Sequence, residues 1–380
     1  MFTQRVRIVL ITAIVTLCIF FLLERRFLPG VTAKGISPKG QELLARVVQL
    51  IKYDYLEEKD PAKTMEGAFK GLANSLDALS GYLDKDAVAK YAQQKESRLN
   101  ETGIVLFKRA GMFPLVTGVV ENSPADKKGL KVGDYLSTID DRTTLLMSQM
   151  ESTLALKAKD AAPVKVRVLR ENSTLDLAVE RTKLFNGPVS YHGAEGTRGI
   201  LKVYYLSPPC VGEIKKAIGP TLKAGKGPLV LDFTNCAEGD LEEARKLINL
   251  FLKADAIGFM EKKAGAKVPF ACLDEAAFKD IPLSVWINQA TMGPAEAVAG
   301  VLQEFKMAKV IGLPTFGAVA QLDFFPLADG SGLVLTSGVF HLNSGTKLFG
   351  EGLKPDITLE VGDQSQATFL KKTLSPPTNP

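Results

Sequence analysis

The sequence predicts an α/β chain, α+β overall, in which a helical N-terminal region and a small β domain precede an α/β core. Apolar residues recur at helical spacing between residues 37 and 76, and short strand-like runs alternate with turn-rich text from 102 to 184. A strand, a tight turn, a helix and a second strand then follow one another from 282 to 321. With 380 residues and 46% hydrophobic composition, the chain is long enough for two or three compact units.

An apolar run at residues 8–23 lies near the N-terminus between flanking arginines. No small residues in the A-x-A pattern follow it, so we expect an uncleaved signal anchor rather than a signal peptide that is removed. The flanking arginines leave the positive-inside rule nearly balanced, and the commoner orientation for such a start keeps the N-terminus in the cytoplasm. Residues 1–34 are therefore predicted to form a single-pass anchor in a cell inner membrane and a linker, with the body facing the periplasm or the cell exterior.

The region from 35 to 98 is predicted to be helical. Ser37 and Pro38 form a helix start signal, an N-cap followed by a proline at the first helical position, and Asp60 with Pro61 repeats it. An apolar stripe at helical spacing follows each start: Leu43, Leu44, Val47, Val48 and Ile51 after the first, and Met65, Phe69, Leu72 and Leu76 after the second.

Residues 99–184 predict a small β domain with two helices. Strand-like runs lie at 104–107, 115–120, 164–169 and 175–179. Between them, Ser123 and Pro124 can start a short helix that Gly129 can end. A Gly133-Asp134 turn then leads into a further strand, Tyr135–Ile139.

The predicted core, residues 185–365, is organised around the turn that follows the apolar strand Leu283–Ile287. A helix begins near Ala295, and another strand begins near Val310. In an α/β enzyme such a turn carries the nucleophile, and backbone N–H groups at the helix start hold the oxyanion. The turn here has Thr291, Met292, Gly293 and Pro294, and it contains no serine, cysteine or histidine.

The rest of the core is predicted to be structural, without residues of a site. Residues 229–233 are expected to be a buried strand, with a helix around Leu247 packing on it, and residues 333–335 and 339–342 are expected to form a hairpin pair. Residues 366–380 are expected to be a C-terminal tail.

Composition excludes some classes of function. The formal net charge is +5, but the basic residues are scattered without interleaved aromatic residues, so we expect no nucleic-acid partner. The spacing of the four cysteines fits no metal or disulfide framework, and we expect no cofactor. Cys272 is expected to be a small buried hydrophobe. Cys210 and Cys236 each follow a predicted strand, so a disulfide between them stays open until their separation is known.

The stretch SPADKKGLKVGDYLSTID resembles the signature of PDZ domains, in particular those inserted in the carboxyl-terminal processing peptidases, or tail-specific proteases. Three further stretches are similar to motifs of that family in the family's order: SLDALSGYL at 75–83, LVLDFTNCAEGDLEEARKLINLFL at 229–252, and GEGLKPDI at 350–357. The resemblance extends from about residue 37 to 360.

The resemblance implies a crotonase-like α/β peptidase core and a serine/lysine dyad that cleaves substrates near their C-termini. A PDZ domain captures a chain end by strand addition, with the terminal carboxylate received by backbone N–H groups. The residues that match the family's carboxylate-binding loop are Thr102, Gly103, Ile104 and Val105. The alternative is that these four residues are simply the first strand of the domain.

The sequence departs from the family at both positions of the dyad. The nucleophile turn NGGSASASE aligns with NQATMGPAE at 288–296, which places Gly293 at the serine. The motif TFGKGxxQ aligns with residues 315–322, which places Ala318 at the lysine and leaves Gln321 one position short of the glutamine. A lysine can activate a serine hydroxyl only if both groups are present, so this step cannot occur at these positions.

The loop that supplies oxyanion donors in the family is also altered. Its NNPGG sequence becomes NCAEG here, so Gly239 matches while Glu238 replaces the other glycine and Ala237 replaces the proline. A carboxylate beside a developing oxyanion would repel it.

Three hypotheses follow. The first is an inactive member of the family that binds protein C-termini or partner proteins. The second is an active serine-type endopeptidase with relocated chemistry, using Thr291 or Cys236. The third is a regulatory subunit of an active family member, or a homo-oligomer. The two histidines, His192 and His341, are expected at the surface or at strand ends rather than in a catalytic triad.

Overall fold

A computed structural model describes residues 38–58, 60–224 and 226–375 of the chain. The predicted anchor at residues 8–23 and its linker lie outside these residues. Within them, no helix has both the length and the apolar character that a membrane crossing requires. The chain divides into two compact units, Met1–Glu66 and Gly67–Pro380, and each is described by itself.

The first unit holds helix α2 (Pro38–Asp54) and the beginning of helix α3 (Pro61–Asn74). Both helices start with the proline that the sequence indicated. At the start of α3, the backbone carbonyl of Asp60 accepts bonds from the N–H and the hydroxyl of Thr64, each at 3.1 Å. The predicted helical character of the N-terminal region is confirmed.

The second unit begins within α3 and continues through strand β1 (Gly81–Leu83) and helix α4 (Lys85–Glu96). The Asp84 side chain caps α4 by accepting the N–H of Ala87 at 2.8 Å. Strand β1 pairs antiparallel with the long strand β16 (Gly332–Leu342), so Gly81 lies opposite Val334. This part of the predicted helical region is therefore attached to a strand of the core.

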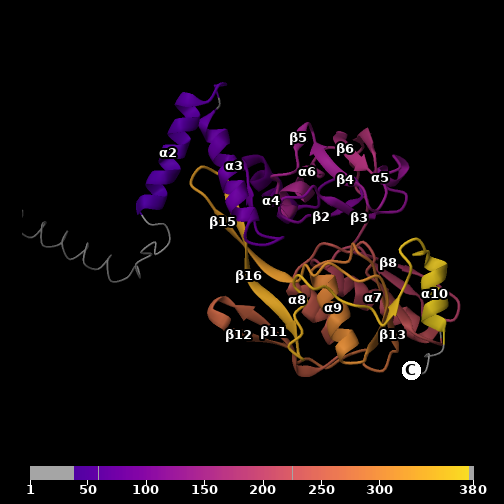
Figure 1. The fold of residues 1–380 in the computed structure, drawn as a ribbon. Helices are drawn as coiled ribbons and strands as arrows, with labels where there is room; N and C mark the ends of the chain where they lie inside the picture. The colour runs from indigo at the N-terminus through magenta and orange to yellow at the C-terminus, as the bar shows by residue number, and fades with distance from the viewer. Residues whose placement is uncertain (1–37, 59, 225, 376–380) are drawn as a thin grey trace, which may run out of the picture. The chain divides into compact units, whose positions relative to one another are not determined.

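The small β domain has one sheet in the order β2-β3-β4-β6-β7, with β5 paired to β4 (Figure 1). Its strands are β2 (Ile104–Phe107), β3 (Leu115–Val119), β4 (Tyr135–Ile139), β5 (Arg142–Thr143), β6 (Val164–Arg170) and β7 (Ser173–Val179). Two helices, α5 (Pro124–Lys127) and α6 (Gln149–Ala155), complete it as predicted. Among the described residues only β3 pairs with β2, so β2 is an edge strand.

The main core sheet has the order β17-β14-β13-β10-β9-β8. Neighbouring strands are parallel except for β8, which is antiparallel to β9. The strands are β8 (Val189–His192), β9 (Ile200–Val203), β10 (Leu229–Asp232), β13 (Leu283–Ile287), β14 (Ala308–Gly312) and β17 (Ile357–Thr358). The bounds of β13 are those predicted from the sequence.

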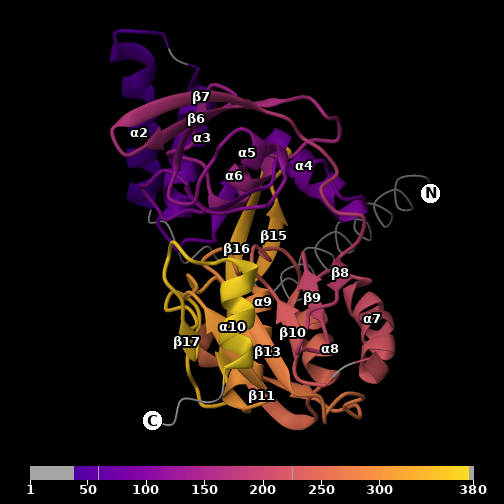
Figure 2. The same cartoon turned by 90° about the vertical axis from the view of Figure 1, so that its right-hand side faces the viewer.

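Helices cover both faces of this sheet. Successive strand residues point to opposite sides, so neighbouring residues of one strand pack against different helices. Leu229 and Leu231 pack in one cluster with the helices α7 (Cys210–Ala224), α8 (Leu241–Asn249) and α9 (Pro294–Glu304). Val230 packs on the other face with Phe369 of α10 (Gln366–Leu374), which lies across β13 in Figure 2. Residues 366–374 are therefore a packed helix, whereas the sequence predicted a tail.

A second core sheet has the order β1-β16-β11-β12, with β15 paired to β16. Its other strands are β11 (Ala254–Lys262), β12 (Lys267–Cys272) and β15 (Ala320–Pro326). The predicted hairpin at 333–342 is wrong, because these residues form the single strand β16, which pairs with β1, β11 and β15. The overall class, α+β with a small β domain and an α/β core, is confirmed.

Candidate functional site

The predicted nucleophile turn lies between β13 and α9, and Gly293 is the residue before the helix. Its backbone has φ +59° and ψ −120°, a conformation that residues other than glycine rarely adopt. A Cβ atom placed on Gly293 would have a single neighbour within 4 Å, the carbonyl oxygen of Ala318 at 3.5 Å. The turn therefore has a backbone conformation that glycine adopts readily, and there is space beside Gly293.

A buried carboxylate holds the two dyad positions together. Glu296 is fully buried, and its Oε2 accepts the N–H groups of Gly293 and Ala318, each at 2.8 Å. Its Oε1 accepts the N–H of Gly317 at 2.8 Å. Burial raises the pKa of Glu296, and the hydroxyl of Thr315 and these N–H groups oppose that rise. The structure thus brings the serine and lysine positions side by side, with neither a hydroxyl nor an amine at them.

A lysine at the end of β11 contacts β15, the strand that begins two residues after Ala318. Lys262, at the end of β11, donates to Oε1 of Gln321, whose Nε2 donates in turn to Asp323 at 3.1 Å. The sequence could not show this contact, because 59 residues separate the two partners. The Lys262 amine is bonded to Gln321 and not to the nucleophile turn.

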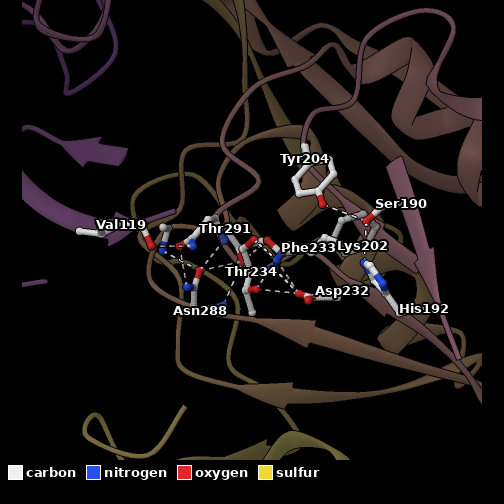
Figure 3. Close-up of polar contacts among 12 residues, drawn as sticks. Val119, Ser190, His192, Lys202, Tyr204, Asp232, Phe233, Thr234, Asn288 and Thr291 are labelled. Atoms are coloured by element: carbon white, nitrogen blue, oxygen red, sulfur yellow. Dashed lines mark hydrogen bonds and ion pairs between the residues drawn. The ribbon is translucent and has the colours of Figure 1, made fainter. Parts of the chain in front are cut away.

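Both candidates for relocated chemistry are buried. The Thr291 hydroxyl donates to the carbonyl of Phe233 at 2.9 Å and accepts the N–H of Asn288 at 2.9 Å (Figure 3). The Cys236 side chain is fully buried, and burial raises the pKa of its thiol far above the ordinary value of 9.0. A buried neutral thiol is a poor nucleophile. Neither residue presents a reactive group to a substrate.

Two asparagines join the altered oxyanion loop to the nucleophile turn. The N–H of Asn235 donates to Oδ1 of Asn288 at 3.0 Å, and Nδ2 of Asn288 donates to Oδ1 of Asn235 at 3.0 Å. Nδ2 of Asn235 also donates to the carbonyl of Val119 in β3 at 3.3 Å (Figure 3). Asn235 therefore links the loop, of which it is part, to the turn and to the small β domain.

Glu238 is paired with cations instead of facing the loop alone. Its carboxylate accepts from Lys157, from Arg98 at 3.3 Å and from Gln94 at 3.3 Å. Burial raises the pKa of Glu238, but Lys157 and Arg98 outweigh it and hold the pKa well below 4.5. The sequence predicted repulsion of an oxyanion by this residue, and the structure adds an ionic contact with the small β domain that sequence reasoning missed.

The small β domain packs directly on the vacant turn. A Cβ atom on Gly118 of β3 would clash with Oδ1 of Asn235 and lie 2.6 Å from Cβ of Ala290. The ring of Phe107 in β2 stacks on Phe316, with centroids 4.5 Å apart and planes within 6° of parallel. Strands β2 and β3 thus cover the turn and the loop that precedes Ala318.

The predicted carboxylate-binding loop begins strand β2, and its carbonyl groups are used internally. The carbonyl of Thr102 accepts the N–H of Ala125 at 3.0 Å, and that of Gly103 accepts the N–H of Val120 at 2.8 Å. Gly103 has φ +90°, and the N–H of Ile104 donates to the Thr102 hydroxyl at 3.3 Å. Ile104 and Val105 are therefore the beginning of the edge strand, with a glycine turn before them, and carboxylate binding by these four residues stays a prediction.

A polar group at the β8 end of the main sheet was not foreseen from the sequence. On β8, Oγ of Ser190 lies 3.0 Å from Nε2 of His192 and 2.9 Å from the hydroxyl of Tyr204 (Figure 3). Lys202 on β9 donates to Asp232 at 3.0 Å. In the described part of the chain, none of these bonds reaches Gly293.

The other histidine and the cysteines have structural surroundings. His341 lies one residue before the end of β16, as expected for a strand-end residue; it is 9% exposed, and its Nε2 lies 2.8 Å from Oε2 of Glu261. Cys210, Cys236 and Cys272 are buried free thiols, so Cys210 and Cys236 form no disulfide in this structure. The described residues contain no group of three or more His, Cys, Asp or Glu that could hold a metal ion.

Comparisons with known proteins give two domain matches. Residues 199–359 match the model of peptidase family S41, and residues 98–180 match that of the PDZ domain. The carboxy-terminal processing protease CtpA of Bacillus subtilis (strain 168) is 26% identical over 367 residues, which cover 96% of this chain and 78% of that protein. A "Probable CtpA-like serine protease" of Staphylococcus aureus (strain COL) is 25% identical over 373 residues, covering 96% of this chain and 73% of the relative.

One solved structure shares the fold over most of its length. The photosystem II D1 C-terminal processing protease superposes with a TM-score of 0.69 and 19% identity, covering 90% of this chain and 98% of that one. At this identity the likeness concerns the fold.

Proposed function

This chain carries a peptidase family S41 domain behind a PDZ domain and is a homologue of CtpA-like carboxy-terminal processing proteases, and from that premise we propose that it is a pseudopeptidase. It binds protein C-termini or partner proteins through its PDZ domain and does not cleave them. The observation that carries this proposal is the shared carboxylate of Glu296, which holds Gly293 and Ala318 where a serine and a lysine would be needed.

The surroundings of these two positions support the absence of chemistry. The hydroxyl of Thr291 is bonded on both sides, and the thiol of Cys236 is buried. The PDZ strand β3 packs against Ala290 in the same turn, where a substrate chain would have to approach. A relocated nucleophile has no free reactive group here with which to attack.

The binding half of the proposal rests on strand β2. It is an edge strand in the described residues, and the loop Thr102–Val105 that begins it matches the carboxylate-binding loop of the family. An extended peptide can add to such an edge and place its terminal carboxylate against backbone N–H groups. The ligand class is therefore a peptide or protein with a free C-terminus.

We further propose that residues 8–23 anchor the protein in a cell inner membrane and that the body faces the periplasm or the cell exterior. In this setting the chain can act alone, as a homo-oligomer, or as a regulatory subunit of an active peptidase. Copurification with an active peptidase from native membranes would favour the regulatory role.

Fluorescence polarisation with labelled decapeptides tests the binding half. A panel of peptides with different apolar C-terminal residues is offered to the purified full chain, each as the free acid and as the C-terminal amide. We expect the free acids to bind and the amides to bind at least tenfold more weakly, because the amide removes the charge that the loop receives. Equal binding of the acids and the amides, or no binding by either, would refute capture of C-termini.

A further inference from the structure

The free edge of β2 is closed by a side chain of helix α6. Val116 lies opposite Leu106 in the β2–β3 pair. Its N–H donates to the carbonyl of Asp134 at 2.8 Å, and its carbonyl accepts the N–H of Gly133 at 2.9 Å. Since this antiparallel pair is not hydrogen-bonded across the ladder, the carbonyl of Leu106 points away from β3. Nε2 of Gln149, the first residue of α6, donates to that carbonyl at 2.7 Å. A peptide strand adding along β2 needs the same carbonyl.

The other half of the Gln149 amide points to a missing donor. Its Oε1 is buried and has no hydrogen-bond partner among the described residues. A buried acceptor without a partner is unfavourable, and native proteins keep few of them. A bound peptide strand brings backbone N–H groups to this place. A bound peptide can thus supply the hydrogen-bond donor that Oε1 of Gln149 lacks when the edge is closed.

The far end of α6 is tied to the S41 domain. Helix α6 ends at Ala155, and Lys157 just beyond it is 5% exposed and pairs with Glu238. Arg98 adds a second cation to the same carboxylate at 3.3 Å. We call these two ion pairs the Glu238 latch. Glycine stands at the Glu238 position in the family motif, so the latch is a feature of this chain.

The opposite wall of the groove is tied to the same domain. Phe107 of β2 stacks on Phe316, two residues before Ala318. The stack holds β2 and the latch holds the chain just beyond α6, so both contacts oppose a widening of the groove between the two elements. A peptide strand adding along β2 takes the place of the Gln149 side chain between β2 and α6, and a shift of α6 that makes room for it would strain the pair of Lys157 with Glu238.

We propose that peptide capture along β2 and release of the Glu238 latch are coupled, so that the latch lowers the affinity of the PDZ domain for its ligand. This inference rests on the proposed function and adds to it a regulation of the same groove. Coupling is reciprocal, so a bound peptide loosens the latch by the same factor by which latch loss tightens peptide binding. Added salt screens the ion pairs, so it should change peptide affinity in the same direction as loss of the latch does.

The test compares Glu238→Gln with wild type in the full chain. The ligand is a fluorescein-labelled decapeptide with a C-terminal valine and a free carboxylate, and the readouts are polarisation and hydrogen exchange. We expect about 5- to 20-fold tighter binding by Glu238→Gln, within the usual range of coupling between two sites. Glu242→Gln is the matched control, because Glu242 pairs with Arg245 of its own helix and should bind as wild type does. In a Gln149→Ala background the edge is already open, so Glu238→Gln should add less than twofold.

Hydrogen exchange without peptide separates this inference from the proposed function. Loss of the latch should speed exchange in residues 149–155 of Glu238→Gln and leave the Glu242→Gln control at the wild-type rate. If peptide binds wild type and Glu238→Gln within twofold of each other, the coupling is overturned while the proposed function stands. If no peptide binds any variant, the proposed function fails, and unchanged exchange in α6 would overturn the latch as well.

Discussion

At the scale of single residues, the site consists of retained backbone geometry around missing side chains. Gly293 keeps φ +59° and lies beside the Ala318 carbonyl, while Glu296 accepts N–H groups from both segments. The carboxylate satisfies buried backbone donors that would otherwise lack partners, and this structural role needs neither a serine nor a lysine side chain. The turn is therefore folded with glycine and alanine at the two aligned positions.

Glu296→Gln tests this structural role. In the variant, an NH₂ group faces at least one of the backbone N–H groups that donate to the carboxylate in wild type. That N–H loses its acceptor, so we expect the free energy of unfolding to fall by about 1–3 kcal/mol. Glu275→Gln is the control, because that exposed carboxylate pairs only with Lys253 in the described residues and should change stability by less than about 0.5 kcal/mol. Urea unfolding followed by fluorescence measures both, and equal stabilities of Glu296→Gln and wild type would contradict the role.

The pKa of Glu238 makes the latch sensitive to acid. Lys157 and Arg98 face its carboxylate, Gln94 donates to it, and Glu101 lies in the same cluster with a pKa that burial raises. The pKa of Glu238 is lowered on folding, so its stabilisation is complete above the ordinary value of 4.5 and is lost as pH falls below it.

Comparison with Glu238→Gln isolates this contribution. At pH 7 we expect wild type to be more stable than the variant by about 1–2 kcal/mol, in the range of a hydrogen bond to a charged group. The difference should shrink between pH 4.5 and pH 3 in urea unfolding curves. A difference that is constant over this range would show that the ionised carboxylate does not stabilise the folded state.

At the scale of elements, strand β3 is the part of the PDZ domain that covers the vacant turn. Gly118 allows the approach, because any Cβ there would meet Asn235 and Ala290. The carbonyl of Val119 then accepts the Asn235 amide at 3.3 Å. A glycine inside a strand is commonly the mark of such a close approach.

Gly118→Val should separate β3 from the turn. Valine suits a strand, so the PDZ domain itself should stay folded while its contact with Ala290 is lost. We expect faster hydrogen exchange in residues 288–292. Gly187→Ala is the control, because a Cβ at that glycine has no neighbour within 4 Å. Unchanged exchange in the turn of Gly118→Val would mean that β3 does not cover it.

Element prediction from the sequence succeeded where a signal was local. The continuous apolar run of β13 between turn residues fixed its bounds, and Pro38 and Pro61 marked two helix starts. The strand β16 was misread as a hairpin, because Ser337 and Gly338 inside it carry turn-like chemistry. Pairing of Gly338 with both Lys262 and Gln321 keeps that segment extended, and such pairing is invisible in one sequence.

The helix α10 was missed for a related reason. Its capping serine, Ser365, which accepts the N–H of Thr368 at 3.2 Å, was a usable start signal. The reason for the helix to form is Trp286, whose ring stacks on Phe369 at 4.9 Å. Tertiary packing of this kind decides short helices, and spacing alone does not reveal it.

At the scale of the whole molecule, the positions that align with the family's dyad could be predicted, and the long-range contacts of the neighbouring loop could not. Gly293 and Ala318 followed from motif alignment, and the structure places them side by side. Lys157 and Glu238 are 81 residues apart, and their pairing depends on how the PDZ domain packs against the S41 domain. Long-range ion pairs of this kind are set by the fold and have no local pattern.

The described molecule therefore has an S41 domain with a buried core and with Gly293 at the position that aligns with the family's serine. Phe233 and Trp286 are buried in two separate hydrophobic clusters. What remains in place is a PDZ domain with an edge strand, held against the S41 domain by Glu238 and Asn235. This arrangement fits a binder of chain ends.

The most direct test of the central claim is mass spectrometry of substrates incubated with the purified full chain. An unfolded protein and decapeptides with free C-termini are sampled over several hours at neutral pH. We predict that every substrate keeps its intact mass while the peptides with free C-termini bind. Product masses that form reproducibly with wild type and disappear in Thr291→Ala or Cys236→Ala would contradict the account and identify the relocated nucleophile.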